Sequence, residues 1–147
     1  MNQRETLKIN SKGHLEIGGC DTVDLAAKFG TPLYVFDEKY IRDMMDVYRD
    51  TIDREYDGHG LVLYASKAFS CMAIYKIAAQ ENIGVDVVSG GELYTALKAG
   101  FPAEKIYMHG NNKLLRELQL AVDSGVGTIV VDSYDEADML NELAQNK

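Results

Sequence analysis

The clearest pattern along the chain is a repeat of short apolar runs separated by longer amphipathic segments. The runs begin at Leu61, Gly84, Ile106 and Thr128, so that the successive intervals are 23, 22 and 22 residues. Each run has the length of one buried strand, and each intervening segment can hold a helix of about ten residues. Strands that alternate with helices in this way indicate βαβ units around a parallel sheet.

Polar residues mark where the predicted helices begin and end. Ser89 opens "SGGE" and Ser133 opens "SYDE", and both match a capping box, in which the serine hydroxyl accepts a backbone N–H and the glutamate three residues later reaches back. Gly100, followed by "FP", should end the helix that begins near Gly91, because proline cannot continue a helix.

The first part of the chain lacks this repeat. "LKINSKGHLEI" predicts a β-hairpin around a Ser-Lys-Gly turn, and "DTVDLAAKFGTP" predicts a short helix from Asp21 to Gly30. "LYVF", residues 33–36, predicts a strand. We therefore expect residues 1–36 to form a separate N-terminal segment, and residues 37–147 to form the α/β part.

A long helix is expected to open the second part. From Glu38 to about Tyr56 the apolar side chains keep helical spacing, and the spaced residues are Ile41, Met44, Met45, Tyr48, Ile52 and Tyr56. We interpret the two methionines as packing residues.

Composition narrows the class of protein. The 147 residues are 46% hydrophobic, which is enough for one core, and the formal net charge of −8 disfavours nucleic acid and anionic membranes as partners. The N-terminus lacks the apolar stretch of a secretion signal, and no window approaches the roughly 18 apolar residues of a membrane span. Cys20 and Cys71 have no metal-type spacing. We expect a cytoplasmic protein with a small-molecule partner, no metal and no membrane attachment.

Lys67 is the first candidate for chemistry. It follows the strand "LVLYA", and ligands of open parallel sheets bind at the carboxyl ends of the strands. Alternation would place Leu63, Ala65 and Lys67 on one face. Asp86 interrupts the apolar run "GVDVV", where an unpaired carboxylate would be costly to bury. We expect Lys67 to pair with Asp86, although a solvated lysine at the rim of the sheet is the ordinary alternative.

Several longer motifs carry a family resemblance. "YASKAFS", "DVVSGGELYTALKAGFP" and "HGNNK", with "GHLEIGG" and "GTPLYVFDE" before them and "VVDSYDE" after them, resemble the diaminopimelate branch of the fold-III, alanine-racemase-like decarboxylases, which use pyridoxal 5'-phosphate. The resemblance covers nearly the whole chain.

The resemblance implies a fold, a cofactor and a reaction. The chain would be the N-terminal portion of a pyridoxal-phosphate-binding (β/α)8 barrel, with Lys67 joined to the cofactor as a Schiff base and Asp86 near both. The reaction would convert meso-2,6-diaminopimelate to L-lysine and carbon dioxide. Decarboxylation of ornithine, arginine or carboxynorspermidine, or cofactor binding without catalysis, are the alternatives.

Other residues near these motifs also have an ordinary structural interpretation. His109 either lines the cofactor pocket or is an ordinary polar strand end. Ser89, with Gly90, could meet an anion at the start of a helix, but capping explains it without a ligand. Lys113 is interpreted as a solvated residue in the first turn of the next helix, with Asn112 as its cap.

Length is where the chain departs from the family. A closed barrel takes about 250 residues, whereas this chain has four repeating strands. We expect a fragment of a longer decarboxylase, which alone would have little activity. The two open sheet edges of such a half-barrel favour self-association, so we expect a homo-oligomer, most simply a homodimer.

Overall fold

The computed structural model describes residues 6–145, and its contacts divide the chain into two compact units, Met1–Val47 and Tyr48–Lys147. The division falls inside the long helix α2 (Glu38–Glu55), whose bounds agree with the predicted amphipathic segment. The predicted domain boundary after residue 36 stays a prediction.

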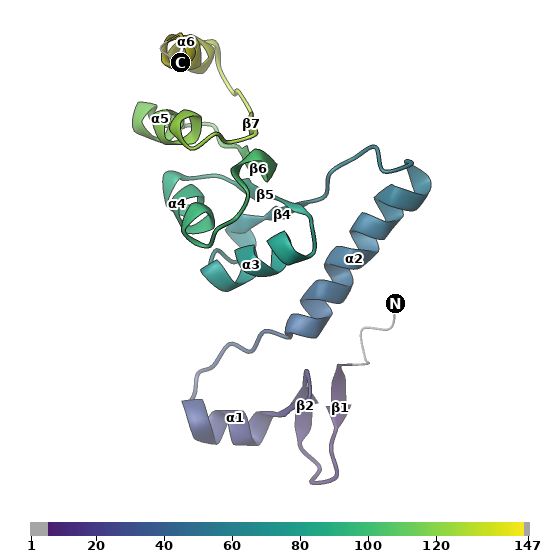
Figure 1. The fold of residues 1–147 in the computed structure, drawn as a ribbon. Helices are drawn as coiled ribbons and strands as arrows, with labels where there is room; N and C mark the ends of the chain where they lie inside the picture. Colours follow the sequence, from purple (N-terminus) through teal and green to yellow (C-terminus); the bar gives the residue numbers. More distant parts are fainter. Residues whose placement is uncertain (1–5, 146–147) are drawn as a thin grey trace. The chain divides into compact units, whose positions relative to one another are not determined.

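The first unit contains a small antiparallel sheet, seen in Figure 1. Its strands are β1 (Leu7–Ile9), β2 (Leu15–Ile17) and β3 (Cys20–Asp21), in the order β1-β2-β3. The Asn10 side chain closes the hairpin by accepting the backbone N–H groups of Lys12 and His14, at 3.0 and 3.1 Å. The predicted hairpin is confirmed, and β3 extends it.

Helix α1 (Thr22–Phe29) follows directly. The Asp21 carboxylate caps it by accepting the backbone N–H groups of Val23 and Asp24, and Gly30 ends it with a φ of 82°. Glycine adopts this left-handed conformation without steric cost. The helix predicted between Asp21 and Gly30 is confirmed.

The strand predicted over residues 33–36 is wrong. These residues form no strand, and all four side chains are exposed. A strand needs a neighbour for its backbone hydrogen bonds, and no described strand pairs with this segment. Residues 33–36 therefore form an exposed segment of irregular backbone between α1 and α2.

The second unit is a parallel sheet with one helix after each strand. The strands are paired in chain order, β4-β5-β6-β7, and the predicted 22-residue repeat is confirmed. The elements are β4 (Leu63–Ala65), α3 (Met72–Gln80), β5 (Gly84–Val87), α4 (Gly90–Lys98), β6 (Ile106–Met108), α5 (Leu115–Asp123), β7 (Thr128–Ile129) and α6 (Tyr134–Ala144). Figure 1 shows these helices following one another beside the strands.

The two faces of this sheet differ in burial. One face carries Val85, Val87, Ile106 and Met108, which are fully buried. Helices α3 and α4 pack against β5, and large buried side chains from the helices complete this core, namely Tyr75, Leu93 and Leu118.

The opposite face carries one row of residues in register. Ala65 pairs with Asp86, Asp86 with Tyr107, and Tyr107 with Thr128, and all four are half-buried. Because residues in register share a face of a parallel sheet, this row lies on the face without helices. A sheet with helices on its outer face and a half-open inner face is the first half of an α/β barrel.

Candidate active site

Lys67 lies where β4 ends. Residues Ser66–Ala68 form one 3₁₀ turn directly after the strand, and the Lys67 side chain is exposed. Within residues 6–145 its Nζ forms no hydrogen bond or ion pair. Within residues 6–145, Lys67 is therefore an exposed amine without a bonding partner at the carboxyl end of the parallel sheet.

The ion pair predicted between Lys67 and Asp86 is not formed in the described part of the chain. The 3₁₀ turn interrupts the strand alternation that would have aligned Lys67 with Ala65. Asp86 is half-buried on the open face, where water can solvate its carboxylate, so a protein partner is not obligatory. Since Asp86 is in register with Ala65, it nevertheless lies beside the strand end that leads to Lys67.

His109 comes from the next strand along. Its backbone N–H donates to the Val87 carbonyl at 2.8 Å, so the ladder between β5 and β6 continues one residue beyond Met108. Alternation places the exposed His109 side chain on the side of Tyr107, which is also the side of Asp86. Lys67, Asp86 and His109 thus come from three consecutive strands and lie toward the carboxyl ends of those strands.

The amino end of α4 is occupied by the protein's own groups. The Ser89 hydroxyl accepts the Glu92 N–H at 3.2 Å, and the Glu92 carboxylate accepts the Val88 N–H at 2.6 Å. The Gly90 N–H donates to Oε1 of Glu117 at 2.7 Å. Capping therefore accounts for "SGGE", and a helix terminus that could have met an external anion holds an internal carboxylate.

Sequence reasoning did not single out Glu117. Besides Gly90, its carboxylate accepts the backbone N–H of Leu114 at 2.9 Å. These hydrogen bonds, from Leu114 and then Gly90, hold the pKa of Glu117 below its usual range. The position of Glu117 three residues after the Leu114 N-cap was the one local signal. The contact with Gly90 spans 27 positions, so no local pattern could predict it.

Lys113 is not the solvated residue that the sequence suggested. Its side chain is 1% exposed, and Nζ lies 2.9 Å from the Glu136 carboxylate, whose side chain is 4% exposed. Helix α5 begins at Leu115 with Leu114 as its N-cap, so the prediction that Asn112 caps the helix is also wrong. Lys113 therefore faces the interior, and α5 begins two residues after it.

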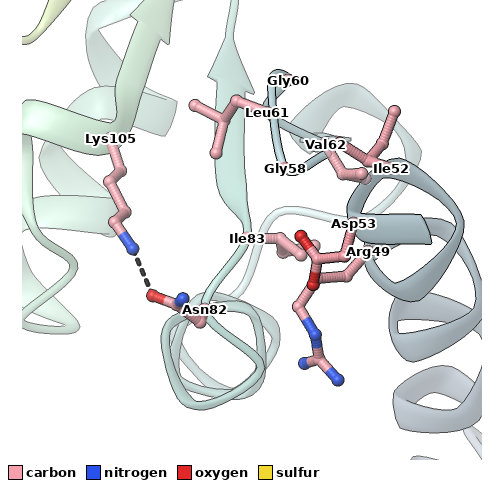
Figure 2. Close-up of a pocket in the computed structure, with 10 residues that line it drawn as sticks. All are labelled: Arg49, Ile52, Asp53, Gly58, Gly60, Leu61, Val62, Asn82, Ile83 and Lys105. Atoms are coloured by element: carbon pink, nitrogen blue, oxygen red, sulfur yellow. Dashed lines mark hydrogen bonds between the residues drawn. The ribbon is translucent and has the colours of Figure 1, made fainter. Parts of the chain in front are cut away.

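A pocket of about 220 Å³ lies at the other end of the sheet, where the segments before β4, β5 and β6 meet the last turns of α2. Figure 2 shows its lining residues. Lys105 donates to the Asn82 side chain, and Arg49 donates to the Glu81 carbonyl at 2.8 Å. Neither Lys67, Asp86 nor His109 lines this pocket, so it is separate from the candidate site.

Two features are absent from the described part of the chain. The described residues contain no group of three or more His, Cys, Asp or Glu side chains placed to hold a metal ion. Among residues 6–145 there is also no helix long and apolar enough to cross a membrane.

The described residues thus form an α/β half-barrel with an exposed lysine after its first strand, a placement suited to covalent binding of a ligand with an aldehyde group. The chain belongs to the family described as "Pyridoxal-dependent decarboxylase, pyridoxal binding domain", whose sequence profile matches residues 41–147.

Several proteins that are similar to this chain are diaminopimelate decarboxylases. The enzyme of Bacillus methanolicus is 51% identical over 142 residues, which are 97% of this chain and 33% of that protein. The enzyme of Bacillus subtilis is 48% identical over 143 residues, or 95% and 32% of the two chains. A crystal structure of diaminopimelate decarboxylase from M. jannaschii in complex with L-lysine matches with a TM-score of 0.86 and 36% identity, covering 99% of this chain and 34% of that one. The chain therefore spans about one third of the length of these relatives.

The described residues fit pyridoxal phosphate at its aldehyde end. An exposed lysine amine without a protein partner can bond to an aldehyde, and Asp86 and His109 supply polar groups from the next two strands of the sheet. The phosphate end is different, because Glu117 already occupies the amino end of α4.

Proposed function

We propose that this chain is the cofactor-binding part of a decarboxylase that converts meso-2,6-diaminopimelate to L-lysine and carbon dioxide. The observation that carries the proposal is the exposed Lys67 amine, which follows β4 two residues after Ala65, the residue paired with Asp86. The names of the similar proteins supply the substrate class. Because the chain spans about one third of these relatives, the reaction is proposed for the whole protein.

Lys67 would hold the cofactor covalently. A lysine bonds to an aldehyde through its neutral amine, with loss of water, and the nitrogen must be reachable from solvent for this to occur. Lys67 meets this condition, since its side chain is exposed. When bound, pyridoxal phosphate supplies the electron sink that carbon dioxide release requires.

Asp86 and His109 would complete the pocket from the two neighbouring strands. The Asp86 carboxylate lies on the half-open face and would supply a hydrogen-bond acceptor to the bound cofactor. His109 would line the pocket one strand further on. Replacement of Asp86 by asparagine should weaken cofactor binding without removing the covalent bond.

A titration with pyridoxal phosphate tests the cofactor site. The chain should develop an absorbance band that Lys67→Ala abolishes. Lys105→Ala is the matched control, because Lys105 lies in the pocket at the opposite end of the sheet, and this variant should keep the band. An equal band in Lys67→Ala would refute the assignment.

A chromosomal substitution tests the reaction in the natural protein. Lys67→Ala in the source organism should create a growth requirement that added L-lysine relieves, and Lys105→Ala should not. Normal growth of the Lys67→Ala strain without lysine would contradict the proposed reaction.

We also propose a cytoplasmic homodimer. In support, β4 and β7 are the two edges of the described sheet, and apolar side chains near β7 are exposed, with Val131 at 48% and Tyr134 at 92%. Exposed edges and apolar patches are typical of surfaces that another chain covers. Sedimentation at micromolar concentration should give twice the chain mass, and a stable monomer would contradict the proposal. Fractionation of source cells should find the protein with the cytoplasmic marker rather than the membrane marker.

A further inference from the structure

Lys113 has an unusual environment for a lysine within a polar segment. Its Nζ donates to the carbonyls of Gly110 and Val130, the latter at 2.9 Å, and lies 2.9 Å from Oε1 of Glu136. Two of the three N–H donors of the ammonium group therefore go to backbone carbonyls, while the Glu136 oxygen lies at ion-pair distance without a hydrogen bond. The Lys113 and Glu136 side chains are 1% and 4% exposed.

The three oxygens belong to segments that the fold brings together at the carboxyl ends of the strands. Gly110 follows β6 and is the residue after His109, Val130 follows β7, and Glu136 lies in the first turn of α6. One buried ammonium therefore joins the end of two strands to the start of a helix. Its hydrogen bond to the Gly110 carbonyl holds the backbone at the residue that follows His109.

Stability alone does not account for this arrangement. Removing an ammonium and a carboxylate from water is costly, and well-packed apolar side chains often serve a protein core as well or better than a buried ion pair. The hydrogen bonds from the Lys113 Nζ to the Gly110 and Val130 carbonyls differ from apolar packing because they have fixed directions. What Lys113 adds is a defined position for the loop that it holds.

We infer that Lys113 is a positioning residue for the candidate active site. By holding the Gly110 and Val130 carbonyls and the Glu136 carboxylate, it sets where the loop after β6 presents His109, on the side of the sheet that carries Asp86. The effect on the cofactor rests on the proposed function, whereas the position of His109 can be measured without any cofactor.

Three variants separate positioning from stability. Lys113→Met removes the charge and leaves Glu136 buried without its partner. Lys113→Met combined with Glu136→Leu replaces the pair by apolar groups, which should restore the thermal stability that the single variant loses. Lys105→Met is the control, because it removes a lysine at the opposite end of the sheet.

The first measurement is the imidazole NMR spectrum of the protein without cofactor. The chain has three histidines, so that His14 and His59 serve as internal references, and His109→Gln assigns the third signal. In the double variant the His109 signal should shift or broaden, while the signals of His14 and His59 stay in place. An unchanged His109 signal in the folded double variant would overturn the inference.

The second measurement is the affinity for pyridoxal phosphate. The double variant should bind at least about tenfold more weakly than the parent chain, equivalent to roughly 1.4 kcal/mol, although its stability is restored. Recovery of both stability and affinity would show that Lys113 is only a packing residue. If His109 moves and the parent chain shows no Lys67-dependent binding, the proposed cofactor site fails while the positioning of the loop stands.

Discussion

Replacing Gly127 by alanine should strongly destabilise the second unit. Gly127 lies directly before β7, and a Cβ added there would stand 2.0 Å from the Glu104 carbonyl oxygen and 2.7 Å from the Glu104 carbonyl carbon. Because Cβ contacts under 3.0 Å essentially do not occur, backbone must move by about 1 Å. The Gly127 N–H also donates to the Ala103 carbonyl at 2.9 Å, and this movement would break that bond.

The expected cost combines two effects. Overpacking of a tight contact costs about 1–3 kcal/mol, and a lost backbone hydrogen bond costs about 1 kcal/mol. A loss of about 3 kcal/mol should lower the melting temperature of a unit of this size by roughly 10 °C or more. Circular dichroism during heating, with urea denaturation for the free energy of unfolding, measures the change.

Gly91→Ala is the matched control for the same substitution. A Cβ at Gly91 would meet nothing closer than the Ser89 Oγ at 3.9 Å, and it lies inside helix α4. Alanine favours a helix over glycine by up to about 1 kcal/mol, so this variant should keep or raise the melting temperature. Equal stability of the Gly127→Ala and Gly91→Ala variants would refute the close approach of β7 to the segment before β6.

Three further substitutions test other parts of the structure. Ser66 is fully buried and its hydroxyl has no partner among the described residues, so Ser66→Ala should leave the free energy of unfolding unchanged or raise it by about 1 kcal/mol; a clear loss in urea denaturation would contradict this. Glu117→Gln should lower the free energy of unfolding at neutral pH, because the pKa of Glu117 is lowered in the folded state. The difference in stability between the parent chain and the variant should shrink as pH falls below the usual glutamate pKa and disappear below the lowered pKa of the folded state. A difference that persists in acid would indicate another cause. At Asp21, burial raises the pKa of the carboxyl, but hydrogen bonds from Asn10, His14 and the helix N–H groups outweigh it and hold the pKa well below its usual range. The stability that Asp21→Asn loses at neutral pH should therefore shrink as pH falls below about 4. Hydrogen exchange of the α1 amides measures this loss, and a loss that grows in acid would contradict the prediction.

The repeat of apolar runs was sufficient to predict the sheet. Residues such as Val85, Val87 and Ile106 are fully buried, and burial of one strand face is what imposes a regular apolar pattern on the sequence. Helix ends were also predictable, because Asp21, Ser89 and Gly100 act on backbone groups within a few residues of themselves.

Contacts between distant residues could not be predicted in the same way. Lys113 lies in the polar segment "HGNNK", so its local pattern indicates solvent, yet its ion-pair partner Glu136 is 23 positions later in the chain. The contact between Glu117 and Gly90 has no local signature either. Strand ends follow from the repeat, so the sequence was sufficient to predict that Lys67, Asp86 and His109 lie toward the carboxyl ends of three neighbouring strands. The 3₁₀ turn after β4, in which Lys67 lies, could not be predicted, because it depends on how the chain leaves that strand.

The central claim is that Lys67 is the lysine that bonds to pyridoxal phosphate, and peptide mapping tests it most directly. The chain is mixed with pyridoxal phosphate, reduced with borohydride and digested, and the modified lysine is identified by mass spectrometry. The account predicts that at limiting cofactor the label is on the peptide containing Lys67, and that Asp86→Asn reduces the labelled fraction. Label spread over the exposed lysines, with no preference for Lys67, would contradict it.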